Sequence, residues 1–462
     1  MQLNAERIGE TIQRFFGSQV ESVARKTKFV QKKSKLTGYK FLGAIIFSIL
    51  EKREMTLSRL AQSCLDMDVE ITEQGLDSRM NEGSVAFLQE MAALALEHFR
   101  LSEPLAIGLL NQFSGVYLID SSQISLPANM SELFSGSGGN ASTASMKVQL
   151  VFDFLHGQFK QFELIHGRAS DQGYRGHWAV IEKDALYIMD LGYYVLDTFR
   201  AIGAQAGYFL SRLQAQTALI DETGQRIALS ELLADQSEPV AEYDVRIGSR
   251  AHHQIPCRLI AIRLPQEVAD RRRQKTKENA RRRGNMVTDA WLKLLDWALF
   301  ITNVPSTMLH KEHVATLYRI RWQIELVFKM CKSFCGLDHI ASLRPERIMT
   351  EFYARLIAVL LTYFLTAPIR LSFDAQFNRE ISPFKVRLTL ERFARFLLLT
   401  LRTSDTFAAQ LHSFYRHVGL FGFKQKRRKS PNSICMIALI SELYHWDTEE
   451  CTPNLILDIT LA

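Results

Sequence analysis

The chain has 462 residues, of which 47% are hydrophobic and 23% charged, the composition of an ordinary soluble globular protein with room for two or three domains. Its formal net charge of +7 is concentrated in two basic runs, 270–284 and 424–429, which make nucleic acid the leading partner class. The longest apolar runs, 41–50 and 356–369, fall short of the roughly 18 to 20 residues that cross a bilayer, so buried helices are predicted there.

The start of the chain and its cysteines predict the compartment. The first 18 residues have no continuous apolar stretch of the kind that a secretory signal carries. The six cysteines are scattered, and no two pairs of them have the spacing of a zinc site. We therefore expect a reduced, cytoplasmic protein without disulfides or structural metal.

Residues 1–110 are predicted to be helical, because apolar residues recur with a helical period and glycine is sparse after Gly43. The stretch 56–92 is predicted to form three short helices, with Thr72 and Ser84 as N-caps. A helix-turn-helix module with 72–80 as its reading helix has this pattern, and so has any small helical bundle. Both interpretations remain open, and we assign the region to DNA binding.

A pattern of strands begins at Gly115. The chain is then predicted to form, in order, a strand at 116–120, a hairpin of strands at 147–154 and 158–165, a helix at 174–183, and strands at 185–190 and 207–213 with a helix between them. Three strands followed by alternating helices and strands is the order of a ribonuclease-H-like core.

This core is interrupted by a segment that is β-rich in its first part and basic and helical in its second. The fold class is therefore α/β, with a ribonuclease-H-like catalytic core, a β-rich insertion, and flanking helical N- and C-terminal regions. The predicted boundaries are 1–110 for the DNA-binding helices, 111–213 and 297–350 for the two parts of the core, 214–296 for the insertion, and 351–462 for the C-terminal helices.

The stretch LYRIRWQIELVFKMCK (317–332) is predicted to be one helix with two different faces. Its core-facing stripe consists of Ile320, Ile324, Val327 and Cys331. The opposite face carries one carboxylate among four groups that could bind phosphate: Tyr318, Arg321, Glu325, Lys329 and Lys332. The polar row could also be a solvated surface with ion pairs one turn apart, such as Arg321 with Glu325.

Asp120 and Asp190 each end a predicted buried strand, and the two strands are neighbours in a ribonuclease-H-like sheet. A helix packed on that sheet would bring Glu325 beside them. Three converging carboxylates repel one another unless divalent cations neutralise them, and such hard oxygen ligands suit Mg²⁺ or Mn²⁺. Two ions about 3.5 to 4 Å apart can activate the attacking oxygen and stabilise the leaving oxygen of a phosphodiester. The pattern predicts phosphoryl transfer on nucleic acid.

Other acids compete for this role on spacing alone. Asp153 is predicted in mid-strand, Asp171 in a turn, and Asp197 on a helix where it could pair with a basic residue.

The arrangement Tyr318-x2-Arg321-x3-Glu325-x6-Lys332 resembles the Tyr-Arg-Glu-Lys signature of bacterial insertion-sequence transposases of family four, a branch of the DDE transposases. VYLIDSSQ and MDLGYY resemble the segments that carry the family's first and second Asp, and LDWALFITNVP (295–305) is similar to its approach to the third acid. The resemblance covers about residues 110 to 345, and the terminal regions match only loosely. Leu326 stands where some relatives have an acid.

The resemblance implies a role for each matched residue. Asp120, Asp190 and Glu325 would be the catalytic metal ligands, with two Mg²⁺ or Mn²⁺ ions per site. The residues that would contact DNA are Tyr318, Arg321, Lys329 and Lys332 on the helix, Arg212 at a strand end, and Trp297. Trp297 would receive a base flipped out of the duplex end, although an ordinary core residue is the alternative.

The resemblance also implies a cut-and-paste transposase. A homodimer would pair two terminal inverted repeats, cleave them through a DNA hairpin, and join the 3′-hydroxyl ends to double-stranded target DNA. The apolar helices around 356–401 are candidates for the dimer interface. Two other interpretations remain: a ribonuclease-H-like nuclease that cuts without joining, and a domesticated DNA-binding protein without catalysis.

Overall fold

The structure, a computed structural model of the chain, describes residues 5–100, 108–138, 142–249, 254–333, 335–336, 338, 340, 342–377 and 381–424, with backbone alone for 370–377. Within these residues the chain forms two compact units. Unit 1 combines Met1–Ala106, Ser121–Ala169 and Gln323–Lys426, and unit 2 combines Ile107–Asp120 with Ser170–Trp322. The basic run 424–429 lies outside the described residues except for Lys424.

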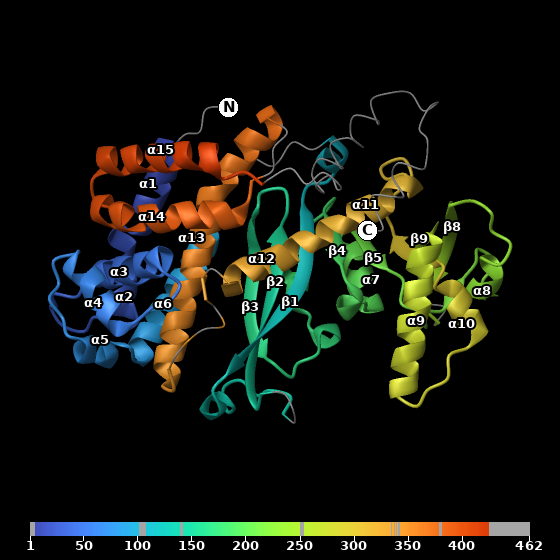
Figure 1. The fold of residues 1–462 in the computed structure, drawn as a ribbon, viewed down its shortest axis with the longest axis horizontal. Helices are drawn as coiled ribbons and strands as arrows, with labels where there is room; N and C mark the ends of the chain where they lie inside the picture. The colour runs from blue at the N-terminus through green and yellow to red at the C-terminus, as the bar shows by residue number, and fades with distance from the viewer. Residues whose placement is uncertain are drawn as a thin grey trace. The chain divides into compact units, whose positions relative to one another are not determined.

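Unit 1 is mainly helical (Figure 1). Its N-terminal helices are α1 (Ala5–Phe15), α2 (Ser18–Lys26), α3 (Gly38–Glu51), α4 (Leu57–Leu65), α5 (Glu73–Arg79) and α6 (Glu82–His98). Its later helices are α12 (Trp322–Ser333), α13 (Pro345–Phe377), α14 (Pro383–Thr400) and α15 (Ser404–Phe421). The two sets pack together, because α13 contacts α6 and α3, α14 contacts α3, and α15 contacts α1.

Of the two predicted N-caps, one is confirmed and one is wrong. Thr72 caps α5, since its hydroxyl accepts a hydrogen bond from the amide of Gly75 at 3.1 Å. Ser84 was the wrong residue for the next cap. Asn81 caps α6 through the amide of Gly83, so the helix begins earlier and is longer than predicted. The Ser84 hydroxyl is buried instead and lies 2.7 Å from that of Thr350 on α13.

The apolar runs are core helices. Almost all of α3 is buried, as predicted for 41–50. Among the described residues one stretch, Pro345–Ile369 of α13, is long and apolar enough to cross a membrane, and 83% of its most apolar window is buried inside the protein. Burial of that kind is expected for the core helix of a globular protein.

The strands form one sheet in the order β3-β2-β1-β4-β5-β10-β9-β8-β6-β7. Their bounds are β1 Val116–Leu126, β2 Ala144–Asp153, β3 Gln158–His166, β4 Leu186–Met189, β5 Tyr208–Arg212, β6 Leu219–Ile220, β7 Arg226–Ile227, β8 Val240–Ile247, β9 Ile255–Arg263 and β10 Trp297–Thr302. In unit 1, β2 and β3 form the predicted antiparallel hairpin. The mixed α/β class is thus confirmed.

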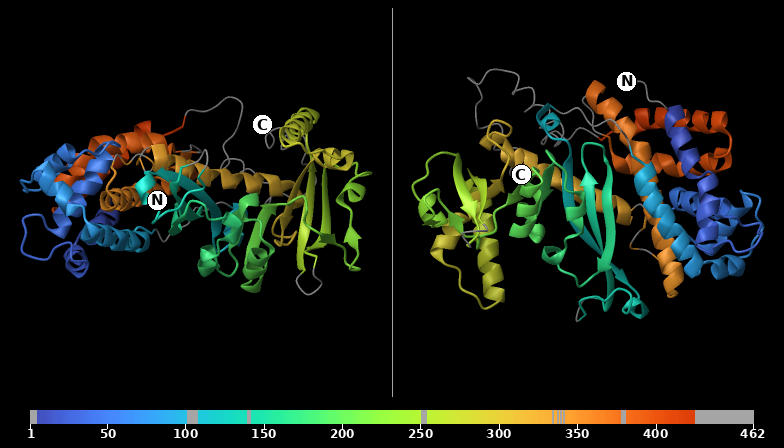
Figure 2. Two further views of the ribbon diagram at one scale, coloured as in Figure 1. Left: turned by 90° about the horizontal axis from the view of Figure 1, so that it is seen from below. Right: turned by 180° about the vertical axis from the view of Figure 1, so that it is seen from behind.

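Unit 2 contains the parallel part of the sheet and the inserted strands (Figure 2). β4 pairs in parallel with β1 on one side and β5 on the other, while β10 is antiparallel to β5 and β9. The helices of this unit are α7 (Leu196–Ala204), α8 (Leu229–Leu232), α9 (Gln266–Arg282), α10 (Asp289–Leu294) and α11 (Val314–Tyr318). The inserted strands β8 and β9 therefore extend the sheet beyond β10 by hydrogen bonds.

The predicted helix at 174–183 is wrong. The segment contains one short 3-10 helix, η4 (Gly176–Val180), and a second, η3 (Asp171–Gly173), comes just before it. The Tyr187 hydroxyl donates a hydrogen bond to the carbonyl of Val180 and accepts one from the amide of Glu182. These backbone groups are the ones that a longer helix would pair internally, so the tertiary contact ends the helix there.

His177 of η4 should make the protein sensitive to acid. It is buried, and neither ring nitrogen has a hydrogen-bond partner among the described residues. Burial, with a smaller contribution from the charge of Arg175, lowers the pKa of His177 from 6.5 to about 4. The unfolded chain therefore binds one proton more than the folded chain between these pH values. The contribution of this residue to stability is fully present above pH 6.5 and is lost as the pH falls towards 4.

Between pH 7 and pH 5 this residue should lower the free energy of unfolding by about 2 kcal/mol. A His177→Phe variant should keep the aromatic packing against Tyr174 and Tyr193 and lose less stability over this pH range than the unaltered protein. Urea unfolding at pH 7 and at pH 5 measures the difference. Parallel acid profiles for the two proteins would show that His177 is protonated as easily in the folded state.

Candidate active site

Asp120 and Asp190 leave neighbouring strands at the same level of the sheet. β1 and β4 are parallel, and their register runs from Val116 beside Leu186 to Ile119 beside Met189. Each aspartate is the next residue of its chain segment. The register therefore brings the two carboxylates to the same edge of the β1–β4 pair, as the sequence predicts.

The position of Asp120 differs from the prediction in one respect. The strand does not end there, because β1 continues to Leu126. Residues Val116 to Ile119 are all buried, Asp120 to Ser122 are partly exposed, and Ile124 and Leu126 are buried again. The apolar run in the sequence therefore marks the end of continuous burial and of pairing with β4, not the end of the strand.

The carboxylate of Asp190 is held by the backbone that follows it. Its Oδ1 accepts a hydrogen bond from the amide of Gly192 at 2.8 Å, which caps the 3-10 turn η5 (Leu191–Tyr193). A Cβ at position 192 would lie only 3.0 Å from that oxygen. Glycine at this position therefore leaves room for the carboxylate to keep its orientation.

Basic and aromatic side chains gather beside Asp120. An Arg321 guanidinium nitrogen lies 3.7 Å from its Oδ2, and both side chains are slightly less than one-fifth exposed. Tyr318 packs on Phe300 with ring centroids 5.2 Å apart, and the guanidinium of Arg212 lies 5.5 Å from the Tyr318 ring. Burial raises the pKa of Tyr318, and the nearby charges of Arg212 and Arg321 partly offset this rise.

The helix that carries the signature is not continuous. α11 ends at Tyr318, the 3-10 turn η8 (Arg319–Arg321) follows, and α12 begins at Trp322 with Glu325 in its first turn. The predicted core stripe is confirmed, since all its members are buried: Ile320, Ile324, Val327 and Cys331.

The polar row is less uniform than predicted. Tyr318 is only 7% exposed, so it is not part of a solvated surface. Glu325 and Lys332 are half-buried, and Lys329 is exposed. Lys332 donates a hydrogen bond to the carbonyl of Gln123 on β1 at 2.9 Å, which ties the end of α12 to that strand in unit 1.

The two aspartates offer the kind of ligand that hard divalent cations prefer. Asp120 and Asp190 supply carboxylate oxygens at one edge of the sheet, and partial exposure leaves water access to them. The two aspartates belong to unit 2 and Glu325 to unit 1. No group of three or more His, Cys, Asp or Glu side chains in the described part of the chain lies close enough together to hold a metal ion.

The competing acids have other partners or positions. Asp153 ends β2, not its middle as predicted, and its carboxylate binds His156 at 2.7 Å. Asp171 starts η3, in the predicted turn region. Asp197 pairs with Arg200 on its own helix α7 at 2.6 Å, as predicted.

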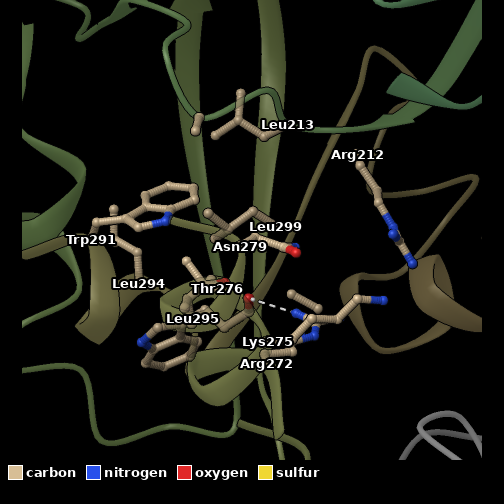
Figure 3. Close-up of a pocket in the computed structure, with 13 residues that line it drawn as sticks. Arg212, Leu213, Arg272, Lys275, Thr276, Asn279, Trp291, Leu294, Leu295 and Leu299 are labelled. Atoms are coloured by element: carbon tan, nitrogen blue, oxygen red, sulfur yellow. Dashed lines mark hydrogen bonds between the residues drawn. The ribbon is translucent and has the colours of Figure 1, made fainter. Parts of the chain in front are cut away.

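Trp297 is a core residue that also lines a pocket. It is 6% exposed and packs with Leu233, Ala241 and Ala261, while the guanidinium of Arg263 lies 4.6 Å from its ring. The pocket has a volume of about 320 Å³ and lies within unit 2 (Figure 3). Its walls come from β5, α9, α10 and β10: Arg212, Leu213, Ala215, Arg272, Lys275, Thr276, Asn279, Trp291, Leu294, Leu295, Trp297, Ala298 and Leu299.

Three pocket residues were missed as site candidates by the sequence reasoning. Arg272 and Lys275 belong to the basic run 270–284, whose many cations look alike in sequence. Trp291 lies six residues before Trp297, and a second tryptophan so close to the first was the available signal. Only the fold shows which cations of α9 face the same pocket as the two rings.

Comparisons with known proteins identify the family of the chain. The family model described as "Transposase DDE domain" matches residues 111–361. A transposase for insertion sequence element IS1151 from Clostridium perfringens is 28% identical over 92% of this chain and 94% of its own. A transposase for IS231F from Bacillus thuringiensis subsp. israelensis is 28% identical over 81% of this chain and 83% of its own.

A solved structure also aligns with the chain. It is a cryo-EM structure of the piggyBac transposase synaptic complex with hairpin DNA, at 8% identity and a TM-score of 0.46, over 96% of this chain and 91% of its own.

The family model covers more than half of the chain and contains both aspartates, the signature segment and the insertion. Enzymes with this domain are metal-dependent and act on DNA. The protein therefore belongs to the DDE-domain transposases, the family of the bacterial insertion-sequence enzymes.

Proposed function

We propose that the protein is a cut-and-paste transposase whose metal ligands are Asp120, Asp190 and Glu325. The observation that carries this proposal is the parallel register of β1 and β4, which brings Asp120 and Asp190 to one edge of the sheet. The strand order β3-β2-β1-β4-β5, with β1, β4 and β5 parallel, supports a ribonuclease-H-like core. Glu325 follows Arg321 by one helical turn, and Arg321 contacts Asp120.

The three carboxylates would hold two Mg²⁺ or Mn²⁺ ions, which would supply activation of a water or 3′-hydroxyl and stabilisation of the leaving oxygen. Arg321 offsets the negative charge of Asp120 in the free protein and would bind the phosphate being cut. Tyr318 is held in place by Phe300 and Arg212, so its hydroxyl can position that phosphate without moving. Lys329 and Lys332 would hold the DNA strand further along α12.

The DNA substrate would be the terminal inverted repeats, which are nicked, converted into hairpins, reopened and joined to target DNA. A hairpin leaves a base unstacked, and the pocket beside Trp297 would receive it. Because Trp297 is mostly buried, its contribution would be one wall and not an exposed stacking platform.

The test is a cleavage assay with Mg²⁺ on duplexes that end in the DNA flanking the gene, with a Glu325→Gln variant alongside. We expect the intact protein to produce a nick, then a hairpin, and finally strand joining, and the variant to bind without cutting. Nicking without joining would support a nuclease instead. Tight binding without cleavage by either protein, in Mg²⁺ and in Mn²⁺, would support a non-catalytic DNA-binding protein.

The active complex would be a homodimer that pairs two ends. Of the helices predicted for its interface, α13 is buried inside unit 1 along Leu356–Ile369. Large apolar side chains are exposed on α14 instead: Phe384, Leu388, Phe396 and Leu399. Size measurement by light scattering should give a dimer with paired DNA ends, and a monomer under those conditions would rule out this part.

A further inference from the structure

The helix α9 has no apolar face that explains its presence. It has 17 residues, and Ala269 is the one that is buried. Helices of globular proteins usually bury an apolar stripe, and one that is polar all round needs another partner. Its sequence carries seven Lys and Arg residues against three acids, so a polyanion suits it.

Two of these cations line the pocket, and the other cations of α9 do not. Arg272 and Lys275 line the pocket from α9, and Arg212 reaches it from β5. In Figure 3 these three cations lie on one side of the pocket, while Trp291, Leu294 and Leu295 lie on the other. None of the residues that line the pocket is acidic.

The acids of α9 are engaged elsewhere. Arg273 pairs with Asp270 and with Asp296, and Arg271 lies near Glu267. Glu278, the third acid, accepts a hydrogen bond from Gln274 at 3.1 Å. The cations at the pocket are therefore left close together without a balancing carboxylate from their own helix. Burial lowers the pKa of Arg272, and the nearby charge of Arg212 lowers it further because like charges repel.

The fold holds this repulsive arrangement in place. Arg272 donates a hydrogen bond to the carbonyl of Trp297 at 3.4 Å, and Arg212 lies over the ring of Tyr318. A site that keeps like charges together against their repulsion gains free energy when an anion enters. The apolar wall opposite them suits the sugar or base attached to such an anion.

We propose that Arg272 and Lys275 of α9, together with Arg212, form a binding site for a backbone phosphate of DNA at the mouth of this pocket. The proposal rests on the function proposed above and extends it, because the site continues the row of DNA contacts from Tyr318 and Arg212 onto the insertion. The insertion would then grip the same DNA strand that the signature residues present to the carboxylates.

The test compares two double variants of the same helix. Arg272→Gln with Lys275→Gln removes two charges from the pocket face, and Lys277→Gln with Arg281→Gln removes two from the opposite face. Lys277 and Arg281 are exposed and do not line the pocket. The affinity for a flanking-sequence duplex and for an unrelated duplex of equal length is measured between 50 and 200 mM salt. Over this range the affinity of a protein with six to ten phosphate contacts falls by roughly 10³ or more.

We expect the pocket-face variant to bind both duplexes more weakly, with a slope of log affinity against log salt that is less negative by about 2. The opposite-face variant should keep a slope within about 0.5 of that of the intact protein, since it removes no proposed contact. Equal slopes for the two variants would overturn the proposal. A second result would also overturn it: the pocket-face variant binds DNA as the intact protein does but no longer binds free deoxyadenosine monophosphate. The ligand of the pocket would then be a free nucleotide and not DNA. Failure of the intact protein to bind either duplex would instead contradict the proposed function.

Discussion

An Asp190→Asn variant is expected to lose cleavage by about 10³-fold or more while it still binds DNA. A metal ligand contributes several kcal/mol of charge stabilisation to the transition state, and each 1.36 kcal/mol corresponds to about tenfold in rate. Asparagine keeps the oxygen that accepts the hydrogen bond from Gly192, so the turn η5 should remain intact. The measurement is the single-turnover rate of nicking on a labelled duplex with Mg²⁺.

The matched control for this experiment is Asp197→Asn. Asp197 lies on α7, seven residues later, and pairs with Arg200 on the surface. Its loss should leave the nicking rate unchanged, because an exposed ion pair contributes little. If the Asp190 variant cuts as fast as the Asp197 variant, Asp190 is not a metal ligand and the assignment of the second carboxylate fails.

The second large effect is expected on stability, from a buried arginine that contacts the chain just after α12. Arg355 of α13 is 1% exposed on its side chain and lies 3.7 Å from the equally buried carboxylate of Glu351. Its guanidinium also donates to the carbonyls of Arg53 and Cys335, at 2.9 and 2.7 Å. Cys335 comes just after α12 ends, so this side chain anchors the far end of the helix that carries Glu325.

Arg355→Met should destabilise unit 1 by about 3 to 5 kcal/mol, because Glu351 and two carbonyls would be left buried with a lost partner. The urea midpoint, followed by circular dichroism, measures this loss. Arg395→Met is the control, since Arg395 is largely exposed and pairs with Asp66 at the surface. That variant should shift the midpoint little, because an exposed ion pair contributes little to stability. Equal midpoints for the two variants would mean that the buried pair contributes no more than a surface one.

Much of the architecture could be predicted where pattern and local structure coincide. The hairpin β2–β3 follows from alternating side chains, and the position of Asp190 at a strand end follows from the short apolar run directly before it. The core stripe of α12 likewise follows from helical spacing. In each case the period of the sequence matches the burial that the fold imposes.

The failures occurred where tertiary contacts decide. The helix expected at 174–183 is prevented by the Tyr187 hydroxyl, which comes from a neighbouring strand and leaves no local signal. The start of α6 was misplaced because Asn81 and Ser84 are both good caps in sequence. The pocket of Arg272, Lys275 and Trp291 could not be predicted, since it joins residues from four elements.

The pairing of β9 with β10 makes the insertion hard to remove. A shortened protein that lacked 214–296 would keep β10 but lose the strand that pairs with it along Trp297–Thr302. β10 would then be an unprotected sheet edge with unpaired backbone amides and carbonyls. The apolar side chains of Phe300 and Ile301 lie on this strand. Such an edge recruits strands from other molecules, so a minimal catalytic core would aggregate during expression unless the new edge strand carried a lysine or a proline.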